Sequence, residues 1–396
     1  MTDRLYYRDS KALEFEATIV ESVESDGKCR VRLDRSAFYP TSGGQLFDRG
    51  SLNGVVIIDV QESDDGEVWH FSERPIGSIG DAVHGSIDPK RRLKNRQQHT
   101  AQHILSSLFI KHYGFETASV HLGEEYGAIE LTTANVEPTQ LTTIEDAANQ
   151  VIQANLPVEI IFAEGHEVAR LPLRKMPDRT GPIRVIRIAD LDCSACGGTH
   201  CQSTAEVQLV KIIGMEKVRG RVLVKFLSGD QAIQDYALRF AVTDFLSRSL
   251  TCAVADLGAI VSAQVDENKS LRKEINSLQK ELLPIRAAAI ASNCEAYGAL
   301  KLAAFASGTM DPAVAGQLAS QVAETISGLA VTISDGRLIL AVSPATGLRA
   351  GELAKQLGPK CGLRGGGSDK IAQLGGAQSA RLNEYKQALL TLIGHA

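Results

Sequence analysis

Aromatic side chains and long apolar runs are scarce in this chain of 396 residues, of which 5% are aromatic and one is tryptophan. Because no run of about eighteen apolar residues occurs, we expect no membrane span. The charged N terminus lacks the apolar stretch of a secretion signal, which indicates a cytoplasmic protein. The length predicts two or three domains, and 44% hydrophobic residues are enough for ordinary cores.

Net positive charge and a disulfide framework are also missing. The formal net charge is −5, so the chain is not a general polyanion binder, and a nucleic-acid partner has to be held by local basic patches. Seven cysteines at irregular spacing exclude a regular disulfide framework. Three of them, Cys193, Cys196 and Cys201, lie close together and indicate a metal site instead.

Two histidines one helical turn apart, His99 and His103, are the most informative residues. At positions i and i+4 of a helix, both imidazoles lie on one face and can hold a metal ion from two sides. Far downstream, Cys196 and His200 have the same spacing, and the two glycines between them let the backbone turn sharply enough to aim both side chains at one point. Three nitrogens and one sulfur suit zinc, so we predict one zinc ion per chain, bound by these four residues.

A second zinc set competes with the first. Cys193, Cys196, His200 and Cys201 would form a local knuckle independent of the helix. The last three of these residues fall within one short stretch, which leaves little room for tetrahedral geometry. The set with His99 and His103 is therefore favoured.

A glycine-rich stretch from Phe38 to Gln45 precedes the histidines. The HxxxH pair, the CxxxH pair and this stretch together resemble the editing domain of alanyl-tRNA synthetase and its free-standing relatives, the alanyl-tRNA editing proteins. The resemblance covers roughly residues 1 to 230. It implies hydrolysis of mischarged aminoacyl-tRNA, with the glycine-rich stretch lining the aminoacyl pocket.

On composition alone, the glycine-rich stretch can equally be a surface loop. In the functional interpretation, Gly43 and Gly44 let a ligand approach the backbone, while Thr41, Ser42 and Gln45 offer hydrogen bonds. A hydroxyl-bearing substrate is best recognised by polar groups that pair with it. Thr41 and Gln45 are therefore the candidate catalytic residues.

A basic run leads directly into His99. A solvated helix start is the ordinary explanation, but cations oppose the dipole at a helix N terminus. Their place before the metal ligands favours contacts to the phosphates at the acceptor end of an RNA. The predicted contacts are Arg91, Arg92, Lys94 and Arg96. His121, in a predicted strand, is a minor pocket candidate.

The pattern of apolar residues predicts an α+β fold. Alternation over residues 1–90 indicates a small antiparallel β-barrel or curved sheet, with turns at 25–28 and 64–66. After the helix with the histidines, we expect a hairpin at 117–131, a helix at 144–154, a loop rich in Arg, Lys and Pro after 170, and strands at 158–162, 205–213 and 221–227.

From about residue 231 the pattern becomes helical. Apolar residues recur at spacings of four and three from Leu257 to Ile285, which is typical of a coiled coil, and Pro284 is expected to end it. This long connecting helix can pack on its own domain or contact a second chain, so a homodimer through the C-terminal region stays open. The last hundred residues predict another α/β unit, with a helix at 311–327 and a hairpin across Asp335 and Gly336.

Glycine is concentrated again between 361 and 376. This stretch resembles the DHH-associated domain of alanyl-tRNA synthetase and of DHH phosphoesterases, although Ala377 stands where the third glycine of the usual pattern would be. No Asp-His-His motif is present, so phosphoesterase chemistry is not expected. The resemblance implies binding of the tRNA body, with Gly365, Gly366, Gly367 and Asp369 as the predicted contacts.

Four parts are therefore expected: an N-terminal barrel, a zinc-containing α/β editing domain, a helical connector and a C-terminal α/β DHH-associated domain, at residues 1–90, 91–230, 231–290 and 291–396. The resemblance implies a trans-editing hydrolase that deacylates tRNA(Ala) carrying chiefly serine and secondarily glycine. Amino-acid activation is not expected, because the synthetase domain would need several hundred residues upstream.

Two alternatives stay open: a non-catalytic tRNA-binding protein with structural zinc, and a zinc hydrolase of small amino-acid esters or amides. Zinc can polarise the carbonyl, activate water or grip the substrate. With four protein ligands it has to expand its shell or lose one, and Cys196 is the ligand expected to give way.

Overall fold

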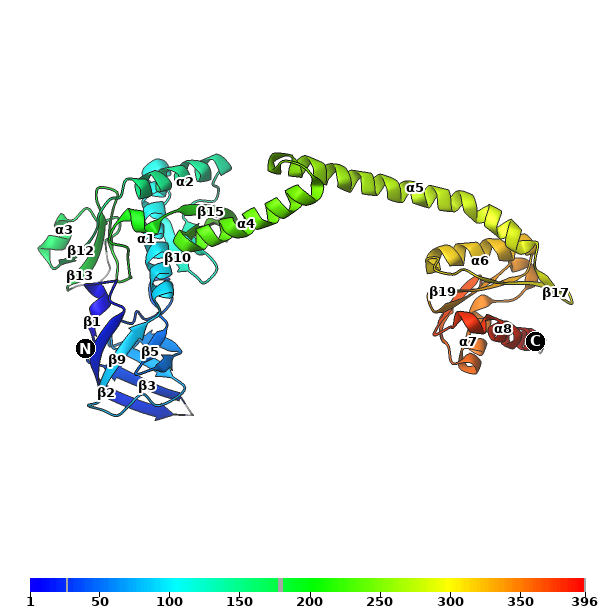
Figure 1. The fold of residues 1–396 in the computed structure, drawn as a ribbon, viewed down its shortest axis with the longest axis horizontal. Coiled ribbons are helices and arrows are strands. Elements are labelled where there is room, and N and C mark those ends of the chain that lie inside the picture. The colour runs from blue at the N-terminus through cyan, green and yellow to red at the C-terminus, as the bar shows by residue number, and fades with distance from the viewer. Residues whose placement is uncertain (26–27, 177–180, 395–396) are drawn as a thin grey trace. The chain divides into compact units, whose positions relative to one another are not determined.

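The computed structural model describes residues 1–25, 28–176 and 181–394. It divides into two compact units, Met1–Ser249 and Leu250–Ala396 (Figure 1). The expected barrel and editing region both lie in the first unit, and the expected C-terminal domain lies in the second. The expected connector is divided between them.

The first unit starts with a nearly closed, barrel-like sheet of seven strands in the order β6-β5-β9-β2-β3-β8-β7 (Figure 1). Its edge strands β6 and β7 are separated in sequence only by Ile58, which brings the two ends of the sheet together. Alternate side chains such as Val31 and Leu33 are buried, as expected for strands with one face in a core. The strands are β2 Glu14–Ser25, β3 Lys28–Leu33, β5 Gly50–Leu52, β6 Val55–Ile57, β7 Asp59–Glu62, β8 Val68–Ser72 and β9 Ala82–Ile87.

A short parallel pair, β1 (Asp3–Arg4) and β4 (Arg35–Ser36), lies beside this sheet. Of the turn predicted at 25–28, Asp26 and Gly27 lie outside the described residues.

Helix α1 (Pro89–Tyr113) is the central element of the first unit and carries both histidines of the HxxxH pair (Figure 1). Asp88 fixes its start, because the Asp88 side chain accepts hydrogen bonds from two backbone N–H groups of the first turn. Gly114 ends it in the left-handed conformation, with φ of 70°. Most residues from 91 to 109 are buried, so α1 is an interior helix.

Two antiparallel sheets pack around α1, in the orders β10-β11-β16-β15 and β12-β13-β14. A single hydrophobic core joins them to the helix, with Leu105 of α1 against Ile129, Ile144 and Ile186. The elements are β10 Thr117–Leu122, β11 Gly127–Leu131, α2 Pro138–Gln153, β12 Val158–Ala163, α3 His166–Arg170, β13 Ile183–Ile188, β14 Asp192–Ala195, β15 Val210–Val218 and β16 Arg221–Ser228.

Most of these elements agree with the pattern of the sequence, and the exceptions have local causes. The hairpin expected at 117–131 is confirmed by β10 and β11. The strand expected from residue 205 begins only at Val210, because Thr204–Val207 forms a 3-10 turn. The expected loop after 170 includes residues 177–180, which lie outside the described residues.

Two long helices lie on either side of the division in the sequence: α4 (Gly229–Leu250) before it and α5 (Leu257–Ala291) after it. The expectation that Pro284 ends the second helix is wrong, since α5 runs past it to Ala291. Leu283 and Ala287 of α5 are buried in a core of the second unit, and this packing offsets the loss of one backbone hydrogen bond at proline. Among the described residues, no single helix combines the length and apolar character of a membrane span, and α4 with residues 254–291 meets that test only as a bent pair.

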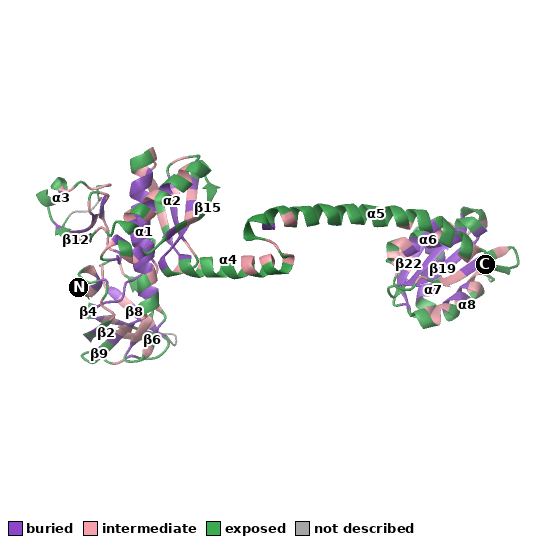
Figure 2. Ribbon diagram, turned by 45° about the horizontal axis from the view of Figure 1, so that its top comes forward, coloured by how far each residue is buried: buried purple, intermediate pink, exposed green. Residues whose placement is uncertain are grey.

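The second unit is a six-stranded sheet in the order β17-β18-β19-β20-β22-β21, with helices on both faces (Figure 1). Buried residues are concentrated in its strands, and the outer helix faces are exposed (Figure 2). Ala330 and Ile339 pack under α5 and α6, whereas Val331 and Leu340 face α7 and α8. The elements are β17 Glu295–Tyr297, β18 Leu300–Ala306, α6 Pro312–Ile326, β19 Leu329–Ser334, β20 Arg337–Val342, α7 Ala350–Cys361, β21 Arg364–Gly367, β22 Ile371–Gly375 and α8 Leu382–Ile393.

Candidate metal centre and active site

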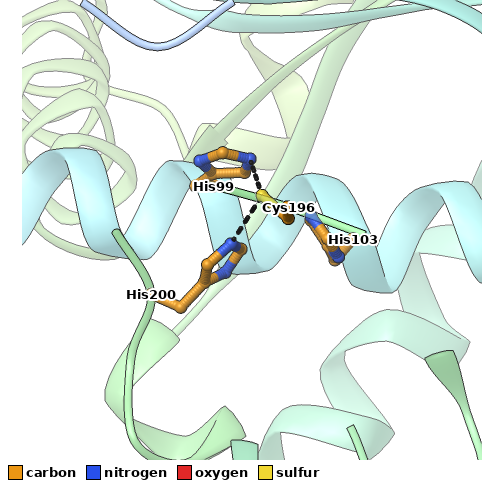
Figure 3. A group of neighbouring side chains, drawn as sticks. All are labelled: His99, His103, Cys196 and His200. Atoms are coloured by element: carbon orange, nitrogen blue, oxygen red, sulfur yellow. Dashed lines mark hydrogen bonds between the residues drawn. The ribbon is translucent and has the colours of Figure 1, made fainter. Parts of the chain in front are cut away.

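The structure brings together the four side chains that the two sequence pairs predicted. His99 and His103 come from one face of α1, and Cys196 and His200 come from the segment that follows β14 (Figure 3). One ligand atom from each residue lies within 4.8 Å of all the others. The Cys196 Sγ atom is 3.4 Å from His99 Nε2 and 3.3 Å from His200 Nε2.

Each of the three imidazoles is fixed from behind by a different partner at Nδ1. His99 Nδ1 donates to the side-chain Oε1 of Gln45 at 2.8 Å, and His103 Nδ1 donates to Asp192 Oδ2 at 2.7 Å. His200 Nδ1 lies 3.2 Å from the Thr100 hydroxyl. These contacts leave Nε2 as the atom that faces the centre of the cluster in at least His99 and His200. Metal-binding histidines in proteins are commonly held in this way.

Asp192 is the main charged group behind the cluster. Burial by itself raises the pKa of this carboxyl, but the hydrogen bonds from His103 and Ser107 and the charges of His103 and Arg174 together lower the pKa to about 2. Its other oxygen accepts from the hydroxyls of Ser107 and Ser194 at 2.7 and 3.0 Å. Burial lowers the pKa of His103, yet the hydrogen bonds to Asp192 and Cys196 and the negative charges of these two groups together raise that pKa to about 9.

The Cys196 thiol is set up to ionise. Burial raises its pKa, but the neighbouring imidazoles of His99 and His200 hold the pKa well below its usual value. The backbone N–H of Gly198 also lies 3.3 Å from the sulfur. A thiolate is the form of cysteine that binds metals.

The turn between Cys196 and His200 is held by Arg184 of β13. Its buried guanidinium donates to the carbonyl oxygens of Cys196 and Gly198 at 2.7 and 2.9 Å. Gly198 is in tight contact with the cluster, since a Cβ atom built there would lie 2.1 Å from His99 Cε1. The backbone of this turn can approach the imidazole only because residue 198 is glycine.

The donor set fits zinc. Two ligands of a tetrahedral zinc ion, one nitrogen and one sulfur, lie about 3.6 Å apart, given bonds of about 2.1 and 2.3 Å. The two nitrogen–sulfur distances in the cluster are close to that value. The competing set is not assembled, because among the described residues the group of ligand atoms contains neither Cys193 nor Cys201. Both of those cysteines are buried in hydrophobic clusters.

The glycine-rich stretch borders the cluster, and Gln45 has a role there that the sequence did not predict. Gln45 is fully buried, and both ends of its amide are occupied: Oε1 by His99 and by the backbone N–H of Thr199, and Nε2 by the Thr199 hydroxyl at 2.9 Å. Both lone pairs of Oε1 and one of the two N–H groups of Nε2 are thereby used. Gln45 therefore orients His99 in the structure, and a direct role toward substrate stays a prediction.

Residues 41–44 of this stretch form an exposed tight turn, whereas Phe38 and Tyr39 are buried. Ser42 and Gln45 exchange backbone hydrogen bonds at 3.1 and 2.9 Å. Gly44 has φ of +85°, and a Cβ there would lie 2.5 Å from the carbonyl oxygen of Val120, so glycine is required. Gly43 also has positive φ, at +57°. The exposed Thr41 hydroxyl accepts from the backbone N–H of Phe47 at 3.1 Å and keeps its own hydrogen to donate.

Two family models match parts of the chain. The threonyl and alanyl tRNA synthetase second additional domain matches residues 183–223, which include Cys196 and His200. The DHHA1 domain matches residues 300–394.

Relatives with known names cover more of the chain. Alanyl-tRNA editing protein Aarsd1 of Danio rerio is 31% identical over 295 residues, which cover 70% of this chain and 69% of that protein. Alanyl-tRNA editing protein AlaX-L of Pyrococcus horikoshii is 28% identical over 394 residues, which cover 94% of each chain. The chain belongs to the alanyl-tRNA editing protein family.

Longer relatives of this editing-family chain are also found. Alanine–tRNA ligase of Methanopyrus kandleri is 29% identical over 97% of the chain, which spans 44% of that protein. Among solved structures, the C-Ala domain of Aquifex aeolicus alanyl-tRNA synthetase aligns with 24% of the chain at 19% identity and a TM-score of 0.22, a likeness too low to bear on function.

The basic run before His99 is turned mostly inward in this member of the editing family. Arg92 is 1% exposed and forms an ion pair with the buried Asp48 at 2.6 Å. Its guanidinium also donates to the carbonyl oxygens of Ser10 and Ala37 at 3.0 and 2.5 Å. The prediction that Arg92 faces RNA phosphate is wrong, because this side chain joins the barrel to α1.

The other cations of the run are also paired with carboxylates. Arg91 and Lys94 both contact Glu124, and Arg96 pairs with Glu206 at 2.5 Å. Burial alone raises the pKa of Glu124, but the hydrogen bonds from Arg91 and Lys94 lower it to about 2. The side chain of Lys94 keeps 19% exposure, against 6% for Arg91 and for Arg96.

The C-terminal glycines form part of a strand rather than a loop. Gly365 and Gly367 of β21 pair with Leu374 and Ala372 of β22, and a Cβ at either glycine would lie within 2.3 Å of the backbone of β22. Close strand packing therefore explains both. Asp369 is outside the strand and exposed, 4.0 Å from Arg349. His121, in the first unit, is an exposed residue of β10.

The groups behind the candidate metal ligands could not be recognised from the sequence of this editing-family chain. Asp192, Thr100 and Arg184 are ordinary polar residues in sequence, and none stands in a motif. The position of Asp192 shortly before Cys196 was the only available signal. A buried carboxylate close to a cysteine ligand is typical of a histidine-supporting group.

Proposed function

We propose that this chain is a trans-acting aminoacyl-tRNA deacylase that removes serine, and secondarily glycine, from mischarged tRNA(Ala). The observation that carries the proposal is the convergence of His99, His103, Cys196 and His200 in a member of the alanyl-tRNA editing family. The names of the relatives supply the alanyl-tRNA substrate, and the donor set supports zinc as the cofactor. A cytoplasmic location is part of the proposal, because translation supplies the substrate.

The residues behind the cluster hold its protons in place. Gln45 Oε1 and the Asp192 carboxylate accept from Nδ1 of His99 and His103, so Nε2 is the ring nitrogen left to bind a metal, which in His103 would displace the Nε2 proton. Zinc bound there would polarise the ester carbonyl, activate a water or grip the amino acid. The Arg184 contacts to the backbone of the 196–198 turn keep Cys196 directed at the same centre.

Thr41 is the proposed specificity residue. Its exposed hydroxyl stands in the same turn as Gln45, which touches His99. A hydroxyl that can both donate and accept pairs with a serine side chain but gains nothing from glycine. Tight turns at Gly43 and Gly44 leave the backbone beside Ser42 open to a small acyl group. Lys94 and Asp369, both partly or largely exposed, stay as proposed contacts to the tRNA.

Deacylation of Ser-tRNA(Ala), Gly-tRNA(Ala) and Ala-tRNA(Ala) tests the function. The wild-type chain should release serine and glycine and spare alanine. Cys196→Ala and His103→Ala should lose zinc and the activity together. His112→Ala, which removes an exposed histidine near the end of the same helix, should keep both.

The same assay separates the alternatives. A chain that binds zinc and tRNA but releases no amino acid is a binding protein with structural metal. Turnover that is the same on a seryl ester without tRNA, and insensitive to salt, indicates a small-ester hydrolase. Thr41→Val should reduce the release of serine more than that of glycine, and equal losses would remove Thr41 from the specificity role.

A further inference from the structure

The long helix α5 exposes an apolar seam along one side. The seam residues follow one another at spacings of four and three, and each keeps between 46 and 66% of its surface exposed. They are Leu271, Ile275, Leu278, Leu282 and Ile285. At these spacings the side chains share one face of the helix, and most of α5 is exposed (Figure 2). A continuous exposed row of this kind marks an interaction surface.

The opposite face of α5 already packs on its own unit. Leu283 and Ala287 are buried in a core of the second unit together with residues of α6. When Ile275 and Leu282 are placed at heptad position a, Leu283 is at b and Ala287 is at f. Positions b and f point away from the seam formed by a and d. The second unit therefore uses one side of α5, and the seam on the other side stays exposed.

The charged residues that flank the seam are arranged for a second copy of the same helix. In this heptad the g positions carry acidic residues, and the e positions carry arginine or glutamine. In two parallel helices in register, each g residue faces the e residue five positions later in the partner helix. The resulting pairs are Glu267 with Arg272, Glu274 with Gln279, and Glu281 with Arg286. No pair joins like charges, so the helix is complementary to itself in this orientation.

The antiparallel orientation is disfavoured by the same charges. There g faces g and e faces e, which would place glutamate against glutamate and arginine against arginine. Within the described part of α5, an ion pair joins Lys269 to Asp266. The charged residues at positions e and g of the described helix have no ion pair inside the chain, so their charges are available to a partner.

A polar residue inside the seam indicates the register. Asn268 occupies position a, one heptad before Ile275. In a parallel pair in register, a faces a, so the two Asn268 amides can hydrogen-bond to each other. Any other register would place this amide against an apolar side chain. The combination of Ile275 at a with Leu271 and Leu278 at d is typical of two-stranded coiled coils.

We propose that residues 261–285 of α5 form a parallel, in-register, two-stranded coiled coil with the same residues of a second copy of this chain. The interface is isologous, so each ion pair between the helices occurs twice. Each copy covers the exposed seam of the other. The inference does not depend on the proposed deacylation, because it rests on the exposure, spacing and charges of α5 alone.

Sedimentation equilibrium of the full chain tests the seam. The wild-type protein should sediment at twice the chain mass. The double variant Leu271→Asp/Leu278→Asp should raise the dissociation constant at least about a hundredfold, because the dimer would bury four carboxylates between apolar side chains. Both leucines are about half exposed in the single chain, so the variant should keep its fold. Circular dichroism and zinc content check that the variant is folded.

Two charge-reversal variants test the orientation. Glu267→Arg/Glu281→Arg makes all four charged e and g positions basic, and Arg272→Glu/Arg286→Glu makes them acidic. Each variant alone should associate about tenfold more weakly than the wild-type protein, because parallel pairing now opposes like charges. An equal mixture of the two should form a heterodimer about as tightly as the wild-type protein forms its homodimer.

Lys273→Glu/Lys280→Glu is the matched control. It also reverses two charges on α5, but at exposed f positions that face away from the seam. This variant should associate like the wild-type protein.

Four results would overturn the coiled coil. A monomeric wild-type protein would mean that the seam is covered from within the chain, and a dimer that survives Leu271→Asp/Leu278→Asp would place the interface elsewhere. A tetramer would exclude two strands. Charge-reversal variants that associate as tightly as the wild-type protein would exclude the parallel register, since like charges already face each other in the antiparallel one.

Discussion

At the scale of single residues, the cluster depends on side chains other than the four candidate ligands. Three imidazoles are supported by an amide, a carboxylate and a hydroxyl, on Gln45, Asp192 and Thr100. Asp192 has further partners, since it also accepts hydrogen bonds from two serine hydroxyls and lies near Arg174. The orientation of the ligands is therefore fixed in the folded chain by hydrogen bonds from the protein alone.

A buried histidine in the barrel gives a pH-dependent prediction. Burial lowers the pKa of His70 to about 4, while its neighbours Ser36 and Val31 bind the two ring nitrogens at 2.8 and 3.3 Å. The unfolded chain takes up this proton near pH 6.5, so the folded state loses stability as the pH falls from about 6.5 to 4. At pH 4.5 the loss from this group should be about 2 kcal/mol.

His70→Gln should remove that part of the pH dependence. Urea unfolding at pH 7 and pH 4.5 measures it, with fluorescence of Trp69, the one tryptophan of the chain and the neighbour of His70 in β8, as a local signal. The wild-type protein should lose about 2 kcal/mol more than the variant between the two pH values. An equal loss of unfolding free energy in the wild-type protein and the variant would show that His70 does not take up a proton on unfolding.

Single residues also show what the sequence could and could not predict. The i and i+4 spacing identified His99 and His103 because a helix alone decides which face they share. Arg92 was misassigned, and the support of His99 by Gln45 was not foreseen, because the partners of these residues lie about 50 residues away along the chain. Spacing predicts local neighbours, whereas the use of a polar side chain depends on distant contacts that only the fold creates.

At the scale of elements, the turn from Cys196 to His200 is more constrained than its two glycines suggest. A Cβ atom at Gly198 would lie 2.1 and 2.2 Å from two atoms of the His99 ring, whereas one at Gly197 would have Tyr7 Oη, at 3.2 Å, as its nearest neighbour. Only the first substitution forces an imidazole out of place. The two adjacent glycines therefore offer a matched pair of tests.

Gly198→Ala should lower the zinc affinity about tenfold or more, which is the usual cost of disturbing a group that orients a metal ligand. Gly197→Ala should leave the zinc affinity nearly unchanged. Competition with a chromophoric chelator gives both affinities. Equal affinities of the two variants would mean that His99 is not a ligand, or that its ring can shift without cost.

Elements whose ends are fixed by local chemistry were the most predictable. The Asp-Pro pair at 311 and 312 correctly predicted the start of α6. The Asp-Gly pair at 335 and 336 correctly predicted the turn of the β19–β20 hairpin. The prediction that the long helix ends at Pro284 was wrong, because packing of α5 in a core of the second unit outweighed the local preference of proline. Gly365 and Gly367 are less informative, because a strand packed closely against its neighbour needs glycine for the same reason as a turn.

At the scale of the whole molecule, the chain contains two separate sets of hydrophobic cores. The described cores of the first unit use residues up to Phe226, and those of the second use residues from Leu283 onward. No described core includes residues of both units. The proposed zinc site and the glycine-rich turn both belong to the first unit.

A fragment of residues 1–249 should therefore fold, bind one zinc ion and release serine from Ser-tRNA(Ala). If the second unit binds the tRNA body, as proposed for Asp369, the fragment should keep kcat and show a KM raised about tenfold, which corresponds to the loss of about 1.4 kcal/mol of binding. Zinc content, the thermal midpoint and steady-state deacylation measure these effects. A fragment with an unchanged KM would assign tRNA binding to the first unit alone. A folded fragment that holds zinc but has lost kcat would show that the second unit contributes to the reaction itself, since binding losses act on KM when chemistry is slow.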